Sequence, residues 1–256
     1  QRAAEASGAE FWFNAEVTSI DRADGRVSGV VLADGRRVVA PIVVNVAGPH
    51  SAVINQMAGV YDSMKIKTRA LRHEVHHVPA PKGFNFEKNG KIMNDGDVGC
   101  YYRPAPGNAI LVGSEDPECD QRQWIDDPDE FNRDVTEIQW NAQVMRLAKR
   151  FEQIGIPIRT KGVVDLYDVS DDWIPIYDKS DLEGFYMAIG TSGNQFKNAS
   201  IAACMMTELI DNCENGVDHD QHPIQFKAAY TKKKLNIGFY SRKRELNKNS
   251  SFSVRG

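Results

Sequence analysis

The clearest change in the pattern of apolar and polar residues lies near residue 190. The apolar run at residues 184–189 predicts a buried strand, and the small and apolar residues of 199–210 predict a packed helix. Between them the chain reads Gly190-Thr191-Ser192-Gly193, a composition typical of a strand-to-helix turn that comes close to a ligand. The free N–H groups of such a helix start favour an anionic or electron-rich atom by about 0.3–1 kcal/mol. An ordinary tight turn without a ligand is the alternative.

The first part of the chain shows strand-like segments separated by turn signals. Asp24-Gly25 and Asp34-Gly35 separate three such segments within residues 9–40, which predicts a β-meander. An apolar strand follows at residues 42–46. A turn of small residues, Ala47-Gly48-Pro49-His50-Ser51, then leads into a predicted helix, and we expect Ser51 to cap it.

From about residue 61 the pattern changes to strands of mixed polarity, which predicts an antiparallel sheet. A helix is expected from Asp127 to about Phe151, because an acidic first turn with a proline precedes apolar residues at helical spacing. Residues 160–169 predict a long strand that returns to the first part. The overall pattern is that of an α/β (α+β) protein.

Composition and charge exclude several classes of protein. The 256 residues are 41% hydrophobic and 26% charged with a net charge of −4, which predicts no general affinity for nucleic acid. No transmembrane run or signal peptide is recognisable. The four cysteines lack a Cys-x-x-Cys spacing, so we expect reduced thiols in a cytoplasmic protein.

Two charged or metal-ligating clusters have ordinary explanations. His73 and His77 fall on one face of a predicted strand, with Glu74 and His76 on the other, and we predict no metal site there. The end of the chain, residues 231–256, is locally basic. It fits a contact with nucleic acid or acidic lipid, but the acidic total charge favours a terminal segment that lies on the protein.

The turn at residue 190 resembles a motif of the flavin-dependent amine and amino-acid oxidoreductases, the superfamily of D-amino-acid oxidase, glycine oxidase, sarcosine oxidase and dimethylglycine dehydrogenase. Those proteins carry Gly-x-Ser-Gly-His-Gly-Phe-Lys where this chain has Gly190-Thr191-Ser192-Gly193-Asn194-Gln195-Phe196-Lys197. Asn194 replaces the frequent histidine, and Gln195 replaces a frequent glycine. The segment Asn45-Val46-Ala47-Gly48-Pro49-His50-Ser51 is similar to a second motif of the family, and Tyr101-Tyr102-Arg103-Pro104 to a third.

The resemblance implies a particular fold. It is an incomplete FAD-binding domain of the glutathione reductase type, at residues 1–60 and 160–256, interrupted by an antiparallel substrate domain with covering helices at residues 61–159. The chain starts at Gln1, and no Gly-x-Gly-x-x-Gly opens a strand–helix unit. We therefore expect a C-terminal portion that lacks the half of the domain that holds the ADP moiety of FAD.

The resemblance also implies site residues. Substrate-lining candidates are Tyr101, Tyr102 and Tyr167, although core packing fits Tyr101 and Tyr102 equally well. Lys197 and Tyr167 are the catalytic candidates, because sarcosine-oxidase-like members combine an aromatic residue with a lysine at these positions. Cofactor contacts are expected from Gly48, Pro49, Gly190, Ser192, Gly193, Asn194, Gln195, Phe196 and Lys197.

The implied activity is oxidation of a C–N bond in a small amine or amino acid, with hydride transfer to FAD. Asp165 occupies the position of the cysteine that attaches flavin covalently in some members, so we expect non-covalent FAD. Leu111 replaces an oxygen-activating lysine, which favours a dehydrogenase; the electron acceptor is either oxygen or a quinone or electron carrier. Two alternatives are a partner subunit or incomplete protein with a relic flavin site, and a non-enzymatic β-rich binding module.

Overall fold

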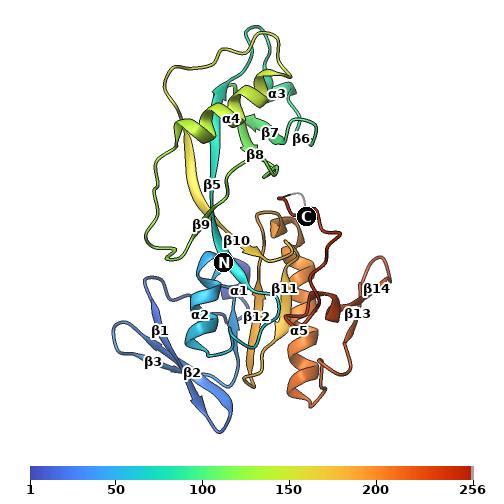
Figure 1. Ribbon diagram of the computed structural model, residues 1–256. Coiled ribbons are helices and arrows are strands. Elements are labelled where there is room, and N and C mark those ends of the chain that lie inside the picture. The colour runs from blue at the N-terminus through green and yellow to red at the C-terminus, as the bar shows by residue number, and fades with distance from the viewer. Residues whose placement is uncertain (255–256) are drawn as a thin grey trace.

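A computed structural model describes residues 1–254 and shows an elongated molecule with two lobes (Figure 1). Two long strands, β5 (Thr68–Pro79) and β10 (Gly162–Ser170), pair antiparallel along their length and run from one lobe into the other. The last described residues lie at the waist between the lobes. These paired strands therefore connect the two lobes.

One lobe begins with a meander of β1 (Val17–Ala23), β2 (Arg26–Leu32) and β3 (Arg37–Val39), as the turn signals predicted. Asp24 and Gly25 both have positive φ, at 51° and 82°, which is the backbone that a two-residue type I′ hairpin requires. A short helix, α1 (Arg2–Glu5), precedes the meander.

The same lobe contains a three-stranded sheet in the order β11-β12-β4. Its strands are β4 (Val43–Asn45), β11 (Ile176–Lys179) and β12 (Phe185–Ile189), with β12 parallel to β4. Each of the two parallel strands leads through a short 3-10 helix into an α-helix. These are η1 (Gly48–His50) with α2 (Ser51–Met57), and η2 (Gln195–Asn198) with α5 (Ala199–Glu214). Because parallel strands end at the same edge, both turns lie on one side of the sheet.

The other lobe is built on a six-stranded sheet in the order β10-β5-β8-β7-β6, with β9 also paired to β5. Its shorter strands are β6 (Met93–Asp95), β7 (Cys100–Ala105), β8 (Ala109–Ser114) and β9 (Gln123–Ile125). Helices α3 (Phe86–Asn89) and α4 (Glu137–Ala148) complete this lobe. The prediction of a mixed α/β chain with an antiparallel sheet and covering helices is confirmed.

The start of α4 was predicted wrongly. The helix begins at Glu137, ten residues after Asp127, because Thr136 caps it: the Thr136 side chain accepts a hydrogen bond from the Gln139 N–H at 3.3 Å. The buried side is formed by Trp140, Gln143, Val144 and Leu147. Ile138, one of the apolar residues at helical spacing in this segment, is instead 78% exposed.

The predicted cap of α2 was also wrong. Ser51 is the first residue of α2, because η1 runs directly into the helix, and the His50 at the N-cap position makes no side-chain capping bond. The buried Asn45 fixes this turn instead. Its Nδ2 donates to the Ser51 carbonyl at 3.0 Å and to Asn55 Oδ1 at 2.8 Å, so the end of β4 is joined to α2.

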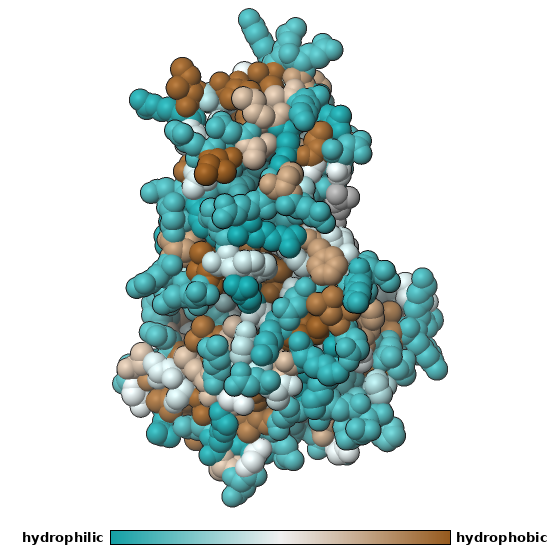
Figure 2. All heavy atoms as spheres, in the orientation of Figure 1, coloured by the Kyte–Doolittle hydropathy of each residue, from teal (hydrophilic) through white to brown (hydrophobic). Residues whose placement is uncertain are grey.

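The hydrophobic core is divided between the lobes. One cluster lies between the meander, α2 and the three-stranded sheet, and includes Ile20, Phe185 and Met187. A second lies between α4 and the six-stranded sheet, and a third beneath α5. On the face shown in Figure 2, hydrophobic surface is broken into separate patches and polar side chains cover much of the waist. No helix within residues 1–254 is long and apolar enough to cross a membrane.

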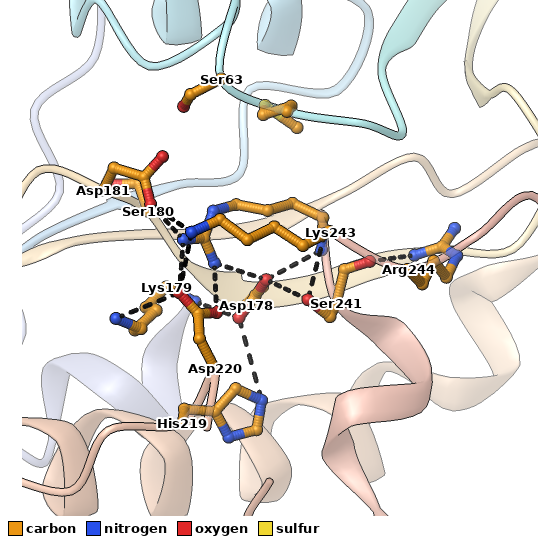
Figure 3. A network of polar contacts seen from close by, with 12 residues as sticks. Ser63, Asp178, Lys179, Ser180, Asp181, His219, Asp220, Ser241, Lys243 and Arg244 are labelled. Atoms are coloured by element: carbon orange, nitrogen blue, oxygen red, sulfur yellow. Dashed lines mark hydrogen bonds and ion pairs between the residues drawn. The ribbon is translucent and has the colours of Figure 1, made fainter. Parts of the chain in front are cut away.

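The C-terminal segment is held to the first lobe by a buried arginine. After the hairpin of β13 (Gln225–Lys227) and β14 (Lys234–Asn236) and the 3-10 helix η3 (Ile237–Tyr240), Arg242 is completely buried. Its guanidinium donates to Asp178 at 2.9 Å, to Asp181 at 2.6 Å and to Asp220 at 3.0 Å (Figure 3). Burial alone would raise the pKa of Asp220, but Arg242 lowers it to about 2.

A second buried charged residue, Asp168 on β10, holds the turn after β12. Its Oδ2 accepts the Gly190 N–H at 2.6 Å, and its carbonyl accepts the Ser192 N–H at 2.7 Å. Burial raises the pKa of Asp168 to about 7, and the hydrogen bond from the Gly190 N–H partly offsets that rise. Asp168 therefore joins β10 to the turn after β12.

Arg242→Met should lower the free energy of unfolding by about 3–5 kcal/mol, because the buried Asp178 loses its counter-charge. The matched control is Lys243→Met, since Lys243 is partly exposed and binds Asp181 and Asp220 from the surface. The Lys243→Met change should lower the free energy of unfolding by at most about 1 kcal/mol. Urea unfolding compares the two variants, and equal losses would contradict the central role of Arg242.

Asp168→Asn should make stability less sensitive to pH. Because the folded pKa of Asp168 is about 7 and the unfolded value is near 3.9, the folded state binds more protons between these values. This carboxyl group therefore destabilises the fold as pH rises through that window, by about 1.4 kcal/mol per pKa unit. Measured by urea unfolding from about pH 4 to about pH 8, the free energy of unfolding of the variant should rise relative to that of the wild type. A difference that stays constant over this range would contradict the raised pKa of Asp168.

Candidate functional site

The register of the six-stranded sheet collects polar side chains on the face opposite α4. Tyr101 pairs with Asn94 on one side and with Gly113 on the other, and Tyr167 pairs with Leu71. Because directly paired residues of an antiparallel sheet point to the same face, Tyr101, Asn94 and Tyr167 share that face with His73. The alternation that was predicted for His73 and His76 holds, since His76 lies on the α4 face against Trp140.

These side chains line a cleft of about 250 Å³ between the sheet and the turn after β12. The sheet contributes Asn94, Tyr101 and Tyr167, and the turn contributes Gly193, Asn194 and Lys197; Val254 completes the lining. The structure thus brings together five residues that the sequence had marked as site candidates.

Tyr101 and Tyr167 lie close to each other in this cleft. Burial raises the pKa of both phenols, and for Tyr167 the neighbouring Tyr101 adds to the effect. Two glycines make room for the rings: a Cβ at Gly113 would collide with Tyr101, and one at Gly193 would come within 2.7 Å of Tyr167. Both phenols are therefore protonated at neutral pH and can donate hydrogen bonds.

Behind Tyr167 lies a second pair of polar residues that the sequence did not single out. The His73 ring stacks on Tyr167 with centroids 4.5 Å apart, and its Nε2 lies 3.0 Å from Asp116 Oδ1. Both His73 and Asp116 are buried. Asp116 follows β8 with a φ of 54°, a conformation that no sequence pattern predicted. His73 and Asp116 are placed to fix the orientation of the Tyr167 ring.

The turn after β12 contains three residues with positive φ. Gly190, Ser192 and Gly193 have φ of 70°, 48° and 77°, and the buried Ser192 hydroxyl donates to the Gly190 carbonyl at 3.2 Å. Asn194 Oδ1 accepts from the side chain of Gln195, but its Nδ2 is buried and has no acceptor within residues 1–254. A buried donor left unpaired costs about 1–3 kcal/mol. Asn194 therefore marks a place where a ligand acceptor fits.

Several predicted site residues lie outside this cleft. Tyr102 points to the α4 face, where it packs against Phe151 with ring centroids 5.6 Å apart. Its neighbour Tyr101 faces the cleft because side chains alternate along a strand. Gln195 accepts from Asn198 at 2.7 Å and lines a separate hollow on the other side of the turn. Phe196 is 98% exposed.

Gly48 and Pro49 lie at the same sheet edge as Gly190 but do not line the cleft. Gly48 has a φ of 57°, and open space surrounds the position of a Cβ there. Pro49 borders a different hollow, with Thr68 and Arg69. In open α/β sheets, ligands bind outside the carboxyl ends of the parallel strands. The open turn at Gly48 and the unpaired Asn194 amide at this edge fit a flat, acceptor-rich group such as a flavin.

Sequence reasoning missed five residues at or beneath the site: Asn94, Asp116, Asp168, His73 as a partner of Tyr167, and Val254. The available signal was the presence of Asp168 and His73 as polar residues within predicted strands. Within residues 1–254, no three His, Cys, Asp or Glu side chains are grouped as metal ligands.

Comparison with known proteins agrees with this geometry. Human mitochondrial sarcosine dehydrogenase is 26% identical over 198 residues, which cover 74% of this chain and 20% of that protein. The L-proline dehydrogenase from P. horikoshii superposes with a TM-score of 0.67 at 20% identity, covering 93% of this chain and 56% of that one. Glycine oxidase from Bacillus cereus gives a TM-score of 0.63 at 19% identity, covering 85% of this chain and 54% of that one.

The chain therefore spans about half the length of these solved relatives and a fifth of the human protein. The family model described as FAD dependent oxidoreductase matches residues 1–209, which is most of the sequence. By this match, the chain belongs to the family of FAD-dependent oxidoreductases.

Proposed function

We propose that this chain forms the substrate cleft of a flavoenzyme that oxidises a C–N bond in a small amino acid, such as sarcosine, glycine or dimethylglycine. The observation that carries the proposal is that Tyr101, Tyr167 and Lys197 line one cleft with the glycine turn at Gly193. The names of the relatives support it, since sarcosine, L-proline and glycine each combine an amine with a carboxylate.

FAD, held without a covalent bond, would supply the hydride acceptor. Gly48, Pro49 and the turn at residues 190–197 would hold it along the shared edge of β4 and β12. The Asn194 amide would donate to an acceptor on its ring system, because its Nδ2 has no other partner among the described residues. Asp165 occupies the position at which some family members have a cysteine. It lies on β10, paired with His73 of β5, and offers no thiol for covalent attachment of the flavin.

Lys197 and the tyrosine pair would bind the substrate. The exposed ammonium group of Lys197 borders the cleft and is placed to pair with a carboxylate, or to add positive charge at the turn. Tyr101 and Tyr167 remain protonated and therefore donate hydrogen bonds rather than remove protons. None of the seven cleft-lining residues is a carboxylate or histidine that would act as a base. The substrate amine would accordingly bind in its unprotonated form.

The electron acceptor would be a quinone or an electron carrier rather than oxygen. Leu111 lies on β8, two residues before Gly113, so its side chain is on the cleft face of the sheet. It therefore occupies the expected position of an oxygen-activating lysine without supplying a charge.

Lys197→Met should raise the KM for sarcosine or slow flavin reduction in the FAD-loaded protein by about tenfold or more, because a charge-assisted hydrogen bond is lost. The assay is anaerobic bleaching of the bound flavin by sarcosine, glycine or L-proline. Lys227→Met, on the distant β13–β14 hairpin, is the matched control. It should change neither the KM nor the rate of flavin reduction. Unchanged kinetics in Lys197→Met would remove this lysine from the site.

Tyr167→Phe keeps the ring on His73 but removes the hydroxyl group. We expect a rise in KM of about 2- to 10-fold, which corresponds to the loss of one neutral hydrogen bond. Tyr102→Phe is the control, because Tyr102 lies on the opposite face of the same sheet. Equal effects of the two substitutions would show that the loss comes from general destabilisation and would contradict a role for Tyr167 in binding.

A further inference from the structure

The C-terminal part of the chain reaches the cleft although it lies beyond the family match. That match ends at residue 209, within α5. Residues 237–254, here called the C-terminal strap, return from the β13–β14 hairpin to the waist between the lobes (Figure 1). The strap is therefore a feature of this chain that the family description does not account for.

Two arginines anchor the beginning of the strap. Arg242 is buried among three aspartates, and its carbonyl accepts the N–H groups of Lys65 and Ile66, each at 3.0 Å. Arg244 binds the fully buried Asp172 with two hydrogen bonds of 2.7 and 3.0 Å. These two arginines fix the position from which the last residues of the strap run across the molecule.

The far end of the strap is attached to the other lobe. The Phe252 carbonyl accepts a hydrogen bond from Arg122 at 2.8 Å, and the Arg122 guanidinium lies over the Trp173 ring, 5.1 Å from its centroid. The side chains of Phe252 and Val254 pack on the cluster of Leu71, Val169 and Trp173, beside Tyr167. The strap therefore joins both lobes across the edge of the cleft.

Among residues 1–254, Val254 is the only aliphatic residue that lines the cleft. The other lining residues are Asn94, Tyr101, Tyr167, Gly193, Asn194 and Lys197. An amino acid in this cleft would place its carboxylate near Lys197 or the tyrosine hydroxyls, and an apolar substituent is best accommodated against an apolar wall. Val254 is the side chain available for that contact.

We propose that the C-terminal strap is a wall of the substrate cleft and that Val254 limits the size of the substituent on the amine. The identity of the ligand in this inference rests on the proposed function. The position of the wall does not depend on it. One apolar group in a pocket changes selectivity by about 10- to 200-fold. Val254 is thus a specificity-determining residue in a segment outside the family match.

The position of the wall is tested without cofactor or substrate. Tetranitromethane nitrates accessible tyrosines, and peptide mapping gives separate rates for Tyr101, Tyr102 and Tyr167. A variant that ends at Ser250 keeps both arginine anchors but removes Phe252 and Val254, so nitration of Tyr101 and Tyr167 should accelerate severalfold. The core residue Tyr102 serves as the internal reference for intact folding.

Leu246→Ala is the matched control, because Leu246 lies on the strap, is exposed and does not line the cleft. It should leave all nitration rates unchanged. Equal rates for Tyr101 and Tyr167 in the wild type and the shortened variant would overturn the proposed wall. Acceleration at Tyr102 as well would assign the effect to unfolding and would also count against it.

Substrate choice is tested with the FAD-loaded protein, using sarcosine and the bulkier N-benzylglycine. Val254→Gly should lower the KM for N-benzylglycine by about tenfold relative to that for sarcosine, and Val254→Phe should shift the ratio the other way. An unchanged ratio would overturn the role of Val254. Failure to oxidise either amine would overturn the proposed function and the role of Val254 in selecting amines. The nitration rates would still decide whether the strap covers the cleft.

Discussion

The buried carboxyl group of Asp168 is the contact on which the arrangement of the site depends. It lies on β10, next to Tyr167, and accepts the N–H of Gly190 in the turn after β12. Successive residues of a strand point to opposite sides, so Tyr167 faces the cleft while Asp168 faces the interior. One short stretch of backbone thereby fixes both a cleft-facing side chain and the glycine turn opposite it. Removing a carboxyl group from water costs free energy, which the raised pKa of Asp168 reflects.

The two lobes contribute different parts of the same site. The six-stranded sheet supplies a row of side chains, in which Gly113 on β8 leaves space for the Tyr101 ring. The lobe with the parallel strands supplies turns at one edge, where Gly193 leaves space for the Tyr167 ring and Gly48 is open to a flat ligand. Family membership favours an enzyme over a non-enzymatic binding module. The chemistry of the cleft agrees with an enzyme that positions a small amino compound and leaves the redox step to its cofactor.

Buried ion pairs determine where the C-terminal segment lies. Net charge and local composition indicated only a basic segment on the surface, yet Arg242 and Arg244 are bound to aspartates inside the protein. Two of those aspartates, Asp172 in the loop before β11 and Asp178 on β11, lie more than sixty residues earlier in the sequence. Asp220 lies 22 residues before Arg242. An ion pair between residues so far apart leaves no periodic pattern in the sequence from which it could be predicted. It brings Val254 to the cleft and Phe252 to the apolar cluster beside it, which no pattern in the sequence predicted.

The sequence by itself determined the local elements whose causes are local. The Asp24-Gly25 hairpin, the glycine turn at residue 190 and the alternation of strand faces all follow from backbone conformation and side-chain period. It also marked Tyr101, Tyr167, Gly193, Asn194 and Lys197, which the fold brings into one cleft. Only the tertiary structure decided which of Tyr101 and Tyr102 faces that cleft, and it added His73, Asp116, Asp168 and Val254. These assignments depend on strand register and on burial across long sequence separations, which no local pattern encodes.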